Sequence, residues 1–64
     1  MDMKERITAW MEGERLTFHA AGLRVGCQPS TVHAWVNGTE PRGLYREKLE
    51  RILRKWERER AHAD

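Results

Sequence analysis

The stretch VGCQPSTVHAWVNG, residues 25–38, decides the fold of this chain. Proline is favoured at the first position of a helix, because the amide hydrogen it lacks would be unpaired there and its φ is already helical. Pro29 therefore indicates a helix start, and Asn37-Gly38 is a stop signal. Three apolar residues between them have the i, i+3, i+4 spacing of one helix face: Val32, Trp35 and Val36. We predict a helix over 29–36 whose other face is polar and exposed.

A second short helix is predicted just before it, over about 18–25. Thr17 is placed as its N-cap, and Gly26 supplies the residue that ends it in a left-handed conformation. Ala20-Ala21-Gly22 are small enough to let another helix approach closely. Two short helices joined by a tight turn that contains glycine form the helix-turn-helix pattern.

Longer helices are expected on both sides of this pair. The first runs over about 2–12, with Asp2 as N-cap and Gly13 as the left-handed residue at its end. The last runs over about 43–61. Apolar residues recur at helical spacing in both: Met3, Ile7, Trp10 and Met11, then Leu44, Tyr45, Leu49, Ile52, Leu53 and Trp56. No run alternates with strand period, so we expect an all-α fold, a small bundle of four to five helices.

Length and composition bound the class of protein. The 64 residues fit one domain, residues 1–64, with a core of marginal size. One cysteine excludes an internal disulfide and suits a reducing compartment. No apolar run approaches the roughly 20 residues that cross a bilayer, and no signal peptide is evident. We expect a cytoplasmic protein without membrane contact, enzymatic activity, cofactor or small-molecule ligand.

The distribution of charge is more informative than its sum of +2. Residues 1–40 hold four Lys or Arg against five Asp or Glu, whereas residues 41–64 hold eight against five. A basic second half is compatible with a polyanionic partner. It is equally what a solvated helix of mixed charge looks like.

Several residues occur at spacings that are typical of a known family. Gly22 is followed four positions later by Gly26, then by Val32 and Trp35, and Asn37-Gly38 closes the pattern. With these residues the stretch LTFHAAGLRVGCQPSTVHAWVNGTEP, 16–41, resembles the DNA-binding domains of phage Cro proteins and lambda-type repressors. The resemblance implies a lambda-repressor-like helix-turn-helix with its core at about 17–38. It also implies action in a bacterial cytoplasm or a phage-infected host.

On this resemblance, helix 29–36 is a recognition helix whose first turn enters the DNA major groove. The candidates for base contact are Gln28, Pro29, Ser30, Thr31, His33 and Ala34. The Gln28 amide can pair with adenine N6 and N7, although the residue can also be read as a poor N-cap. His33 either contacts DNA or is simply exposed to solvent.

Contacts to phosphate must come from elsewhere, because the predicted recognition helix contains no Lys or Arg. The candidates are Thr17, His19, Arg24, Asn37, Gly38, Arg42 and Arg46. The family often has Gln at the first position of the preceding helix, where this chain has Phe18. Thr17 or His19 would then make that contact. Arg24 and Arg46 are equally well explained as surface charge.

A metal site is not expected from the cysteine and histidines, since their spacing fits no zinc pattern. Cys27 is expected to act as a small buried apolar residue. Trp10 and Trp35 fall on apolar helix faces, so we expect both in the core.

The last helix also suggests a dimer contact. Tyr45, Leu49, Ile52 and Trp56 are spaced 4, 3 and 4, like a short coiled-coil seam. The same residues are also compatible with packing inside one domain. A homodimer would match a two-fold operator with half-sites roughly 34 Å apart.

Two functions follow as expectations. The first is a sequence-specific transcriptional regulator of the repressor kind, binding a palindromic site in double-stranded DNA as a homodimer. The alternative is a helix-turn-helix module for protein interaction, such as an antitoxin or adaptor, whose last helix binds the partner. The neutral recognition helix and the modest net charge keep the alternative open.

Overall fold

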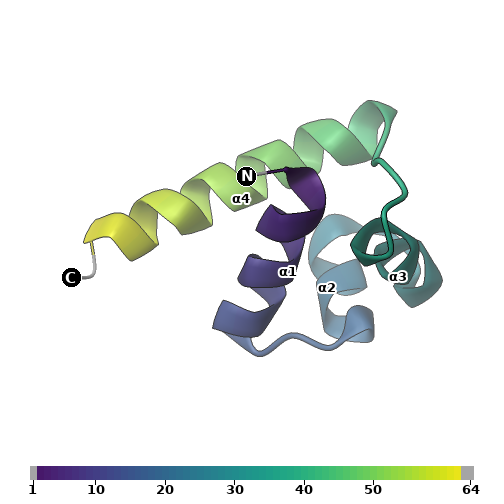
Figure 1. The fold of residues 1–64 in the computed structure, drawn as a ribbon, viewed down its shortest axis with the longest axis horizontal. Helices are drawn as coiled ribbons and strands as arrows, with labels where there is room; N and C mark the ends of the chain where they lie inside the picture. The colour runs from purple at the N-terminus through teal and green to yellow at the C-terminus, as the bar shows by residue number, and fades with distance from the viewer. Residues whose placement is uncertain (1, 63–64) are drawn as a thin grey trace.

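The computed structural model describes residues 2–62, and these form four α-helices and no strand. In chain order they are α1 (Met3–Glu14), α2 (Phe18–Val25), α3 (Pro29–Val36) and α4 (Gly43–His62). α4 crosses one side of the other three helices, which lie together beneath it in Figure 1. The predicted all-α fold is confirmed with four helices. No helix in the described part of the chain combines the length and the apolar character that a membrane span requires.

α1 begins as predicted and ends later than predicted. The Asp2 carboxylate accepts a hydrogen bond from the Glu5 amide at 2.8 Å, which caps the helix start. The left-handed residue at its end is Arg15, with φ 55°, so the prediction of Gly13 for this role is wrong. Beyond the helix end, the Leu16 amide donates to the Met11 carbonyl at 2.8 Å, which gives one of the last carbonyls of the helix a hydrogen-bond partner.

The α2–α3 connection agrees with the local signals. The Thr17 hydroxyl accepts a hydrogen bond from the Ala20 amide at 3.1 Å, and Gly26 is left-handed with φ 91°. Gly22 lies under the turn, where an added Cβ would be 2.5 Å from the carbonyl oxygen of Cys27. Only glycine allows this approach, which sets how tightly α3 follows α2.

All four helices contribute to one core. Its buried side chains are Ile7, Trp10 and Met11 from α1, Ala21 and Val25 from α2, Val32 and Trp35 from α3, and Leu49 and Leu53 from α4. The prediction that Trp10 and Trp35 are core residues is confirmed. Leu44, which the apolar pattern included, is 75% exposed. It lies about 140° around α4 from Leu49 at 100° per residue, and so faces away from the core.

Polar contacts hold the second half of α4 against α1. The Arg6 guanidinium donates to Glu57 through Nε at 2.9 Å and to Glu50 at 2.8 Å. The hydrogen bonds to Glu57 and Glu50 raise the pKa of Arg6, and the bond from Arg6 lowers the pKa of Glu50. α4 is therefore positioned by a charged network as well as by the apolar core.

Candidate nucleic-acid interface

The outward side of α3 is formed by residues opposite its buried side. Val32 and Trp35 point into the core, which leaves the far side of the helix to solvent. Of the six residues predicted to contact bases, four are exposed and two are half-buried. The exposed ones are Gln28, Pro29, Ser30 and His33, and the half-buried ones are Thr31 and Ala34.

Gln28 immediately precedes α3 with an extended backbone, φ −77° and ψ 154°. Its side chain makes no capping hydrogen bond to the helix. Gln28 therefore occupies the N-cap position, as the alternative interpretation of a poor N-cap expected, but its side chain does not cap the helix. Its exposed carboxamide keeps one acceptor and a pair of donors for another molecule.

His33 lies at the centre of a small polar and aromatic cluster on the same surface. Its ring meets that of Phe18 edge to face, with 5.1 Å between centroids. The side-chain amide of Asn37 donates to the His33 carbonyl at 3.0 Å, close to the end of α3. The exposure expected for His33 is confirmed. The Phe18 contact also brings the first turn of α2 beside the outward side of α3.

Thr31 is placed apart from Ser30 and His33. It lines a hollow together with Gly22, Leu23 and Tyr45, on the side of α3 that turns toward α2 and α4. The helical rotation of 100° per residue puts it at the edge of the buried side.

The phosphate candidates divide into two groups. Thr17 and His19 are exposed at the start of α2. Asn37, Gly38, Arg42 and Arg46 are exposed between the end of α3 and the first turn of α4. The Trp35 and Tyr45 rings, 5.8 Å apart, join the end of α3 to that first turn.

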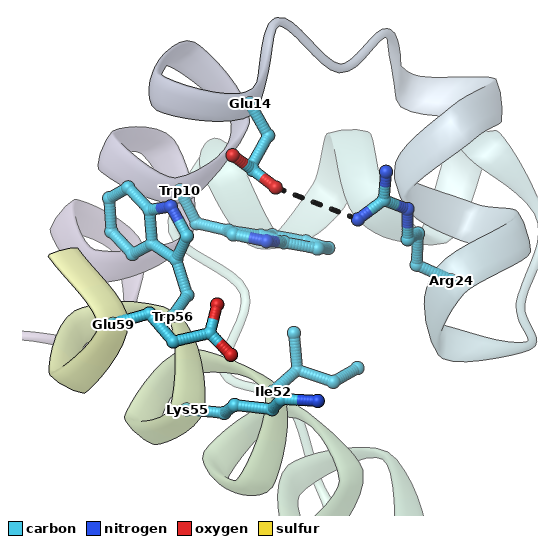
Figure 2. Close-up of a pocket in the computed structure, with 7 residues that line it drawn as sticks. All are labelled: Trp10, Glu14, Arg24, Ile52, Lys55, Trp56 and Glu59. Carbon is cyan, nitrogen blue, oxygen red and sulfur yellow. Dashed lines mark ion pairs between the residues drawn. The ribbon is translucent and has the colours of Figure 1, made fainter. Parts of the chain in front are cut away.

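Arg24 is directed elsewhere. Its guanidinium lies 3.8 Å from the Glu14 carboxylate, and Figure 2 shows it turned toward α1. The hollow it lines is formed by residues of α1, α2 and α4, without any from α3. The structure therefore does not bring Arg24 to the outward side of α3.

Cys27 packs against the core but is half-buried, so its predicted full burial is only partly met. Burial raises the pKa of its thiol. Within residues 2–62, no three His, Cys, Asp or Glu side chains are arranged to hold a metal ion.

The proposed dimer seam requires a correction at Leu49. This side chain is 0% exposed and forms part of the domain's own core, so it is not accessible to a second copy. Ile52 and Trp56 are half-buried against the same core, whereas Tyr45 is 39% exposed. The coiled-coil spacing of these residues reflects intramolecular packing at Leu49.

Two sets of residues were missed in the sequence, although each had a signal. Glu50 and Glu57 are seven residues apart and so share a side of α4, which allows both to reach Arg6. Lys48, Arg51 and Lys55 share another side of α4 at i, i+3 and i+7.

Comparisons with protein-family models, curated proteins and solved structures find no match for this chain. Its function is therefore inferred from its own residues.

Proposed function

We propose that this chain is a sequence-specific regulator that binds double-stranded DNA in the manner of Cro proteins and lambda-type repressors. In this proposal α2 and α3 form a helix-turn-helix, and the first turn of α3 enters the major groove. The observation that carries it is Gln28, whose exposed carboxamide precedes α3 and is not used to cap the helix. The regulator acts by occupying its site and needs no cofactor.

Base recognition is assigned to the outward side of α3. Gln28 pairs with adenine through its carboxamide, and the Ser30 hydroxyl donates or accepts a hydrogen bond. His33 is exposed beside them. Pro29 and Ala34 contact a thymine methyl group. Thr31 is half-buried at the edge of this set, and it lines the hollow near Tyr45 together with Gln28.

Affinity is assigned to phosphate contacts around α3, because the helix itself carries no Lys or Arg. The proposed contacts are Thr17, His19, Asn37, Gly38, Arg42 and Arg46. The backbone amides of Asn37 and Gly38 already donate to carbonyls of α3, at 3.1–3.2 Å, so a phosphate bound there would share those donors. Arg24 is left out, because it faces Glu14 on the side away from α3.

A homodimer is proposed on the DNA, since one small domain supplies few contacts. Tyr45 is its centre, because Leu49 is buried and Ile52 and Trp56 are half-buried. A two-fold dimer reads a palindrome whose half-sites lie one helical turn apart, roughly 34 Å.

Selection from a library of random duplex DNA at near-physiological salt tests the proposal. The expected result is enrichment of one imperfect palindrome. Uniform retention of all sequences would mean binding to the backbone alone. No retention by the folded protein would contradict DNA binding altogether.

A second candidate function is supported by one specific observation. Leu23 and Leu44 are 72% and 75% exposed, the most exposed of the large apolar side chains in the described residues. A helix-turn-helix module that binds a protein, as an antitoxin or adaptor does, would use such residues. A stable hetero-complex together with absent salt-sensitive DNA binding would favour this function.

A further inference from the structure

The side of the domain where α2 faces α4 carries two hollows that run into each other. One is lined by Leu23, Lys48 and Arg51, among others. The other, of about 260 Å³, is the one drawn in Figure 2. Arg24 and Ile52 line both hollows. Because they share walls, they form one depression, which we call the α2–α4 groove: Leu23, Arg24, Lys48, Arg51, Ile52 and Lys55.

The walls of the α2–α4 groove are basic. Its four cations are Arg24, Lys48, Arg51 and Lys55. Two carboxylates, Glu14 and Glu59, lie at one end, and Glu14 already faces Arg24 at 3.8 Å. Within residues 2–62, the three α4 cations form no ion pair. The groove therefore presents three cations without an ion pair in the described residues, and its cations outnumber its carboxylates by four to two.

The floor of the α2–α4 groove is apolar. Leu23 is 72% exposed, and Ile52 is half-buried between the two hollows. Trp10 and Trp56 line the hollow drawn in Figure 2 together with Ile52. Phosphate binding alone requires cations but no apolar floor. This combination favours an occupant that carries both apolar and negatively charged side chains.

A second copy of the chain fits this groove poorly. In a two-fold contact the same patch faces itself, so a groove with four cations and two carboxylates would meet the same excess of positive charge. Like charges brought together in this way oppose association. Ser30 and His33 on α3 do not line the groove, although Leu23 also lines the neighbouring hollow that contains Gln28 and Tyr45. The cations of the groove are therefore different side chains from those assigned to base contact.

We propose that the α2–α4 groove binds an acidic amphipathic helix of a partner protein. Apolar side chains of that helix cover Leu23 and Ile52, and its carboxylates face Lys48, Arg51 and Lys55. Lys48 and Lys55 are about 10.5 Å apart along α4 at 1.5 Å per residue. A partner helix that lies along α4 therefore presents carboxylates over two turns. This proposal does not rest on the proposed DNA-binding function.

Synthetic peptides of about 15 residues serve as the probe, because this length spans the groove as a helix. One peptide has Leu and Glu at helical spacing on adjoining faces, a second has Gln for each Glu, and a third has Ser for each Leu. Titration into the isotope-labelled full chain is followed by NMR. The first peptide is expected to shift signals at Leu23, Ile52 and the Trp56 indole. The Gln and Ser peptides are each expected to bind roughly tenfold more weakly.

Matched variants test the walls of the groove. Lys48→Glu with Arg51→Glu should weaken binding of the first peptide by roughly tenfold or more. Lys4→Glu with Arg58→Glu makes the same change in net charge outside the groove and should leave binding nearly unchanged. All four side chains are exposed, and Lys48→Gln with Arg51→Gln repeats the test should the reversed charges disturb the fold.

Any one of several outcomes would overturn the proposal. They are no binding of the acidic amphipathic peptide, equal binding of its Gln version, equal losses in the two double variants, and groove shifts that follow protein concentration alone. The last would mean that a second copy occupies the groove. A random-sequence DNA duplex provides a further test. If it shifted the NMR signals of the groove residues and the peptide did not displace it, the groove cations would instead be assigned to phosphate binding.

Discussion

The Trp56 indole of α4 lies against Gly13 of α1, where a Cβ added to Gly13 would be 2.5 Å from Cζ2 of the ring. The Arg60 guanidinium carbon lies over the same ring, 5.1 Å from its centroid. Gly13 is thus retained in the helix for close packing rather than for its conformational freedom. The contact between Gly13 and Trp56 positions the C-terminal half of α4 against α1.

Gly13→Ala is expected to displace Trp56, because the new methyl group and the indole cannot share one space. The Trp56 Nε1 signal in an NMR spectrum should move, and the free energy of unfolding should fall. The control is the same change in a Trp56→Ala chain. There it should stabilise by about 0.5–1 kcal/mol, since alanine is the better helix former. Stabilisation of equal size in both backgrounds would contradict the contact.

Gly22→Ala is expected to lower the free energy of unfolding by about 1–3 kcal/mol through overpacking. The new Cβ would meet the Cys27 carbonyl oxygen, which belongs to the backbone and cannot rotate away. Leu23 is the next residue and is 72% exposed, so Leu23→Ala should change the free energy of unfolding by less than about 0.5 kcal/mol. Urea unfolding measures both. A neutral Gly22→Ala would show that the α2–α3 turn is looser than described.

Leu49→Ala and Leu44→Ala separate core packing from association. Leu49 is fully buried, so its truncation should cost about 2–5 kcal/mol at any protein concentration. Leu44 is largely exposed, and its truncation should cost less than about 0.5 kcal/mol. Urea unfolding at two protein concentrations measures both. A Leu49→Ala loss that appeared only at high concentration would place Leu49 in a dimer contact after all.

The hydrogen bond from Arg6 lowers the pKa of Glu50. The free energy of unfolding therefore depends on pH through Glu50. A carboxylate with a lowered pKa stabilises the fold above its unfolded pKa, roughly 4.3, and loses this contribution as pH falls through the folded value. Arg6→Met should therefore destabilise at pH 7 by roughly 1–3 kcal/mol and much less at pH 2.

Thermal unfolding between pH 2 and 7 checks this dependence. Lys4→Met is the control, because Lys4 is exposed and forms no ion pair within residues 2–62. Equal destabilisation by Arg6→Met at both ends of the range would mean that Arg6 acts through packing of its stem alone.

Gln28→Ala and Arg42→Ala are expected to affect DNA binding differently. Loss of the Gln28 carboxamide should relax the preference at one base position of each half-site, at a cost of about 1–3 kcal/mol on the preferred sequence. Loss of the Arg42 charge should weaken all sequences alike and reduce the dependence on salt. Competition assays at several salt concentrations measure both effects. If Gln28→Ala left the ranking of DNA sites unchanged, the proposed placement of α3 in the major groove would be wrong.

Local signals in the sequence predicted the helices well. Asp2, Thr17 and Gly26 do what their positions indicated, because capping joins residues only three or four positions apart. Gly13 was wrongly predicted to end α1, and Leu49, whose spacing also suggested a dimer contact, belongs to the core. In both cases the deciding contact comes from another helix, Trp56 over Gly13 and the shared core around Leu49.

The candidate interface shows the same division. Helical periodicity was enough to predict the exposure of Ser30 and His33. It did not show that Phe18 would lie against His33, or that Arg24 would turn to Glu14. Both contacts depend on how α2 is oriented against its neighbours.

By itself, the sequence determined where each helix begins, which side of it is apolar, and that no strand forms in residues 2–62. Hydrogen bonds between near neighbours and the 3.6-residue period are sufficient for that. Only the tertiary structure decided how the helices meet. Arg6 and Glu57 are joined across 51 positions, and the groove between α2 and α4 is lined by side chains of separate helices. Such contacts form only when the core brings distant segments together, so no local pattern records them.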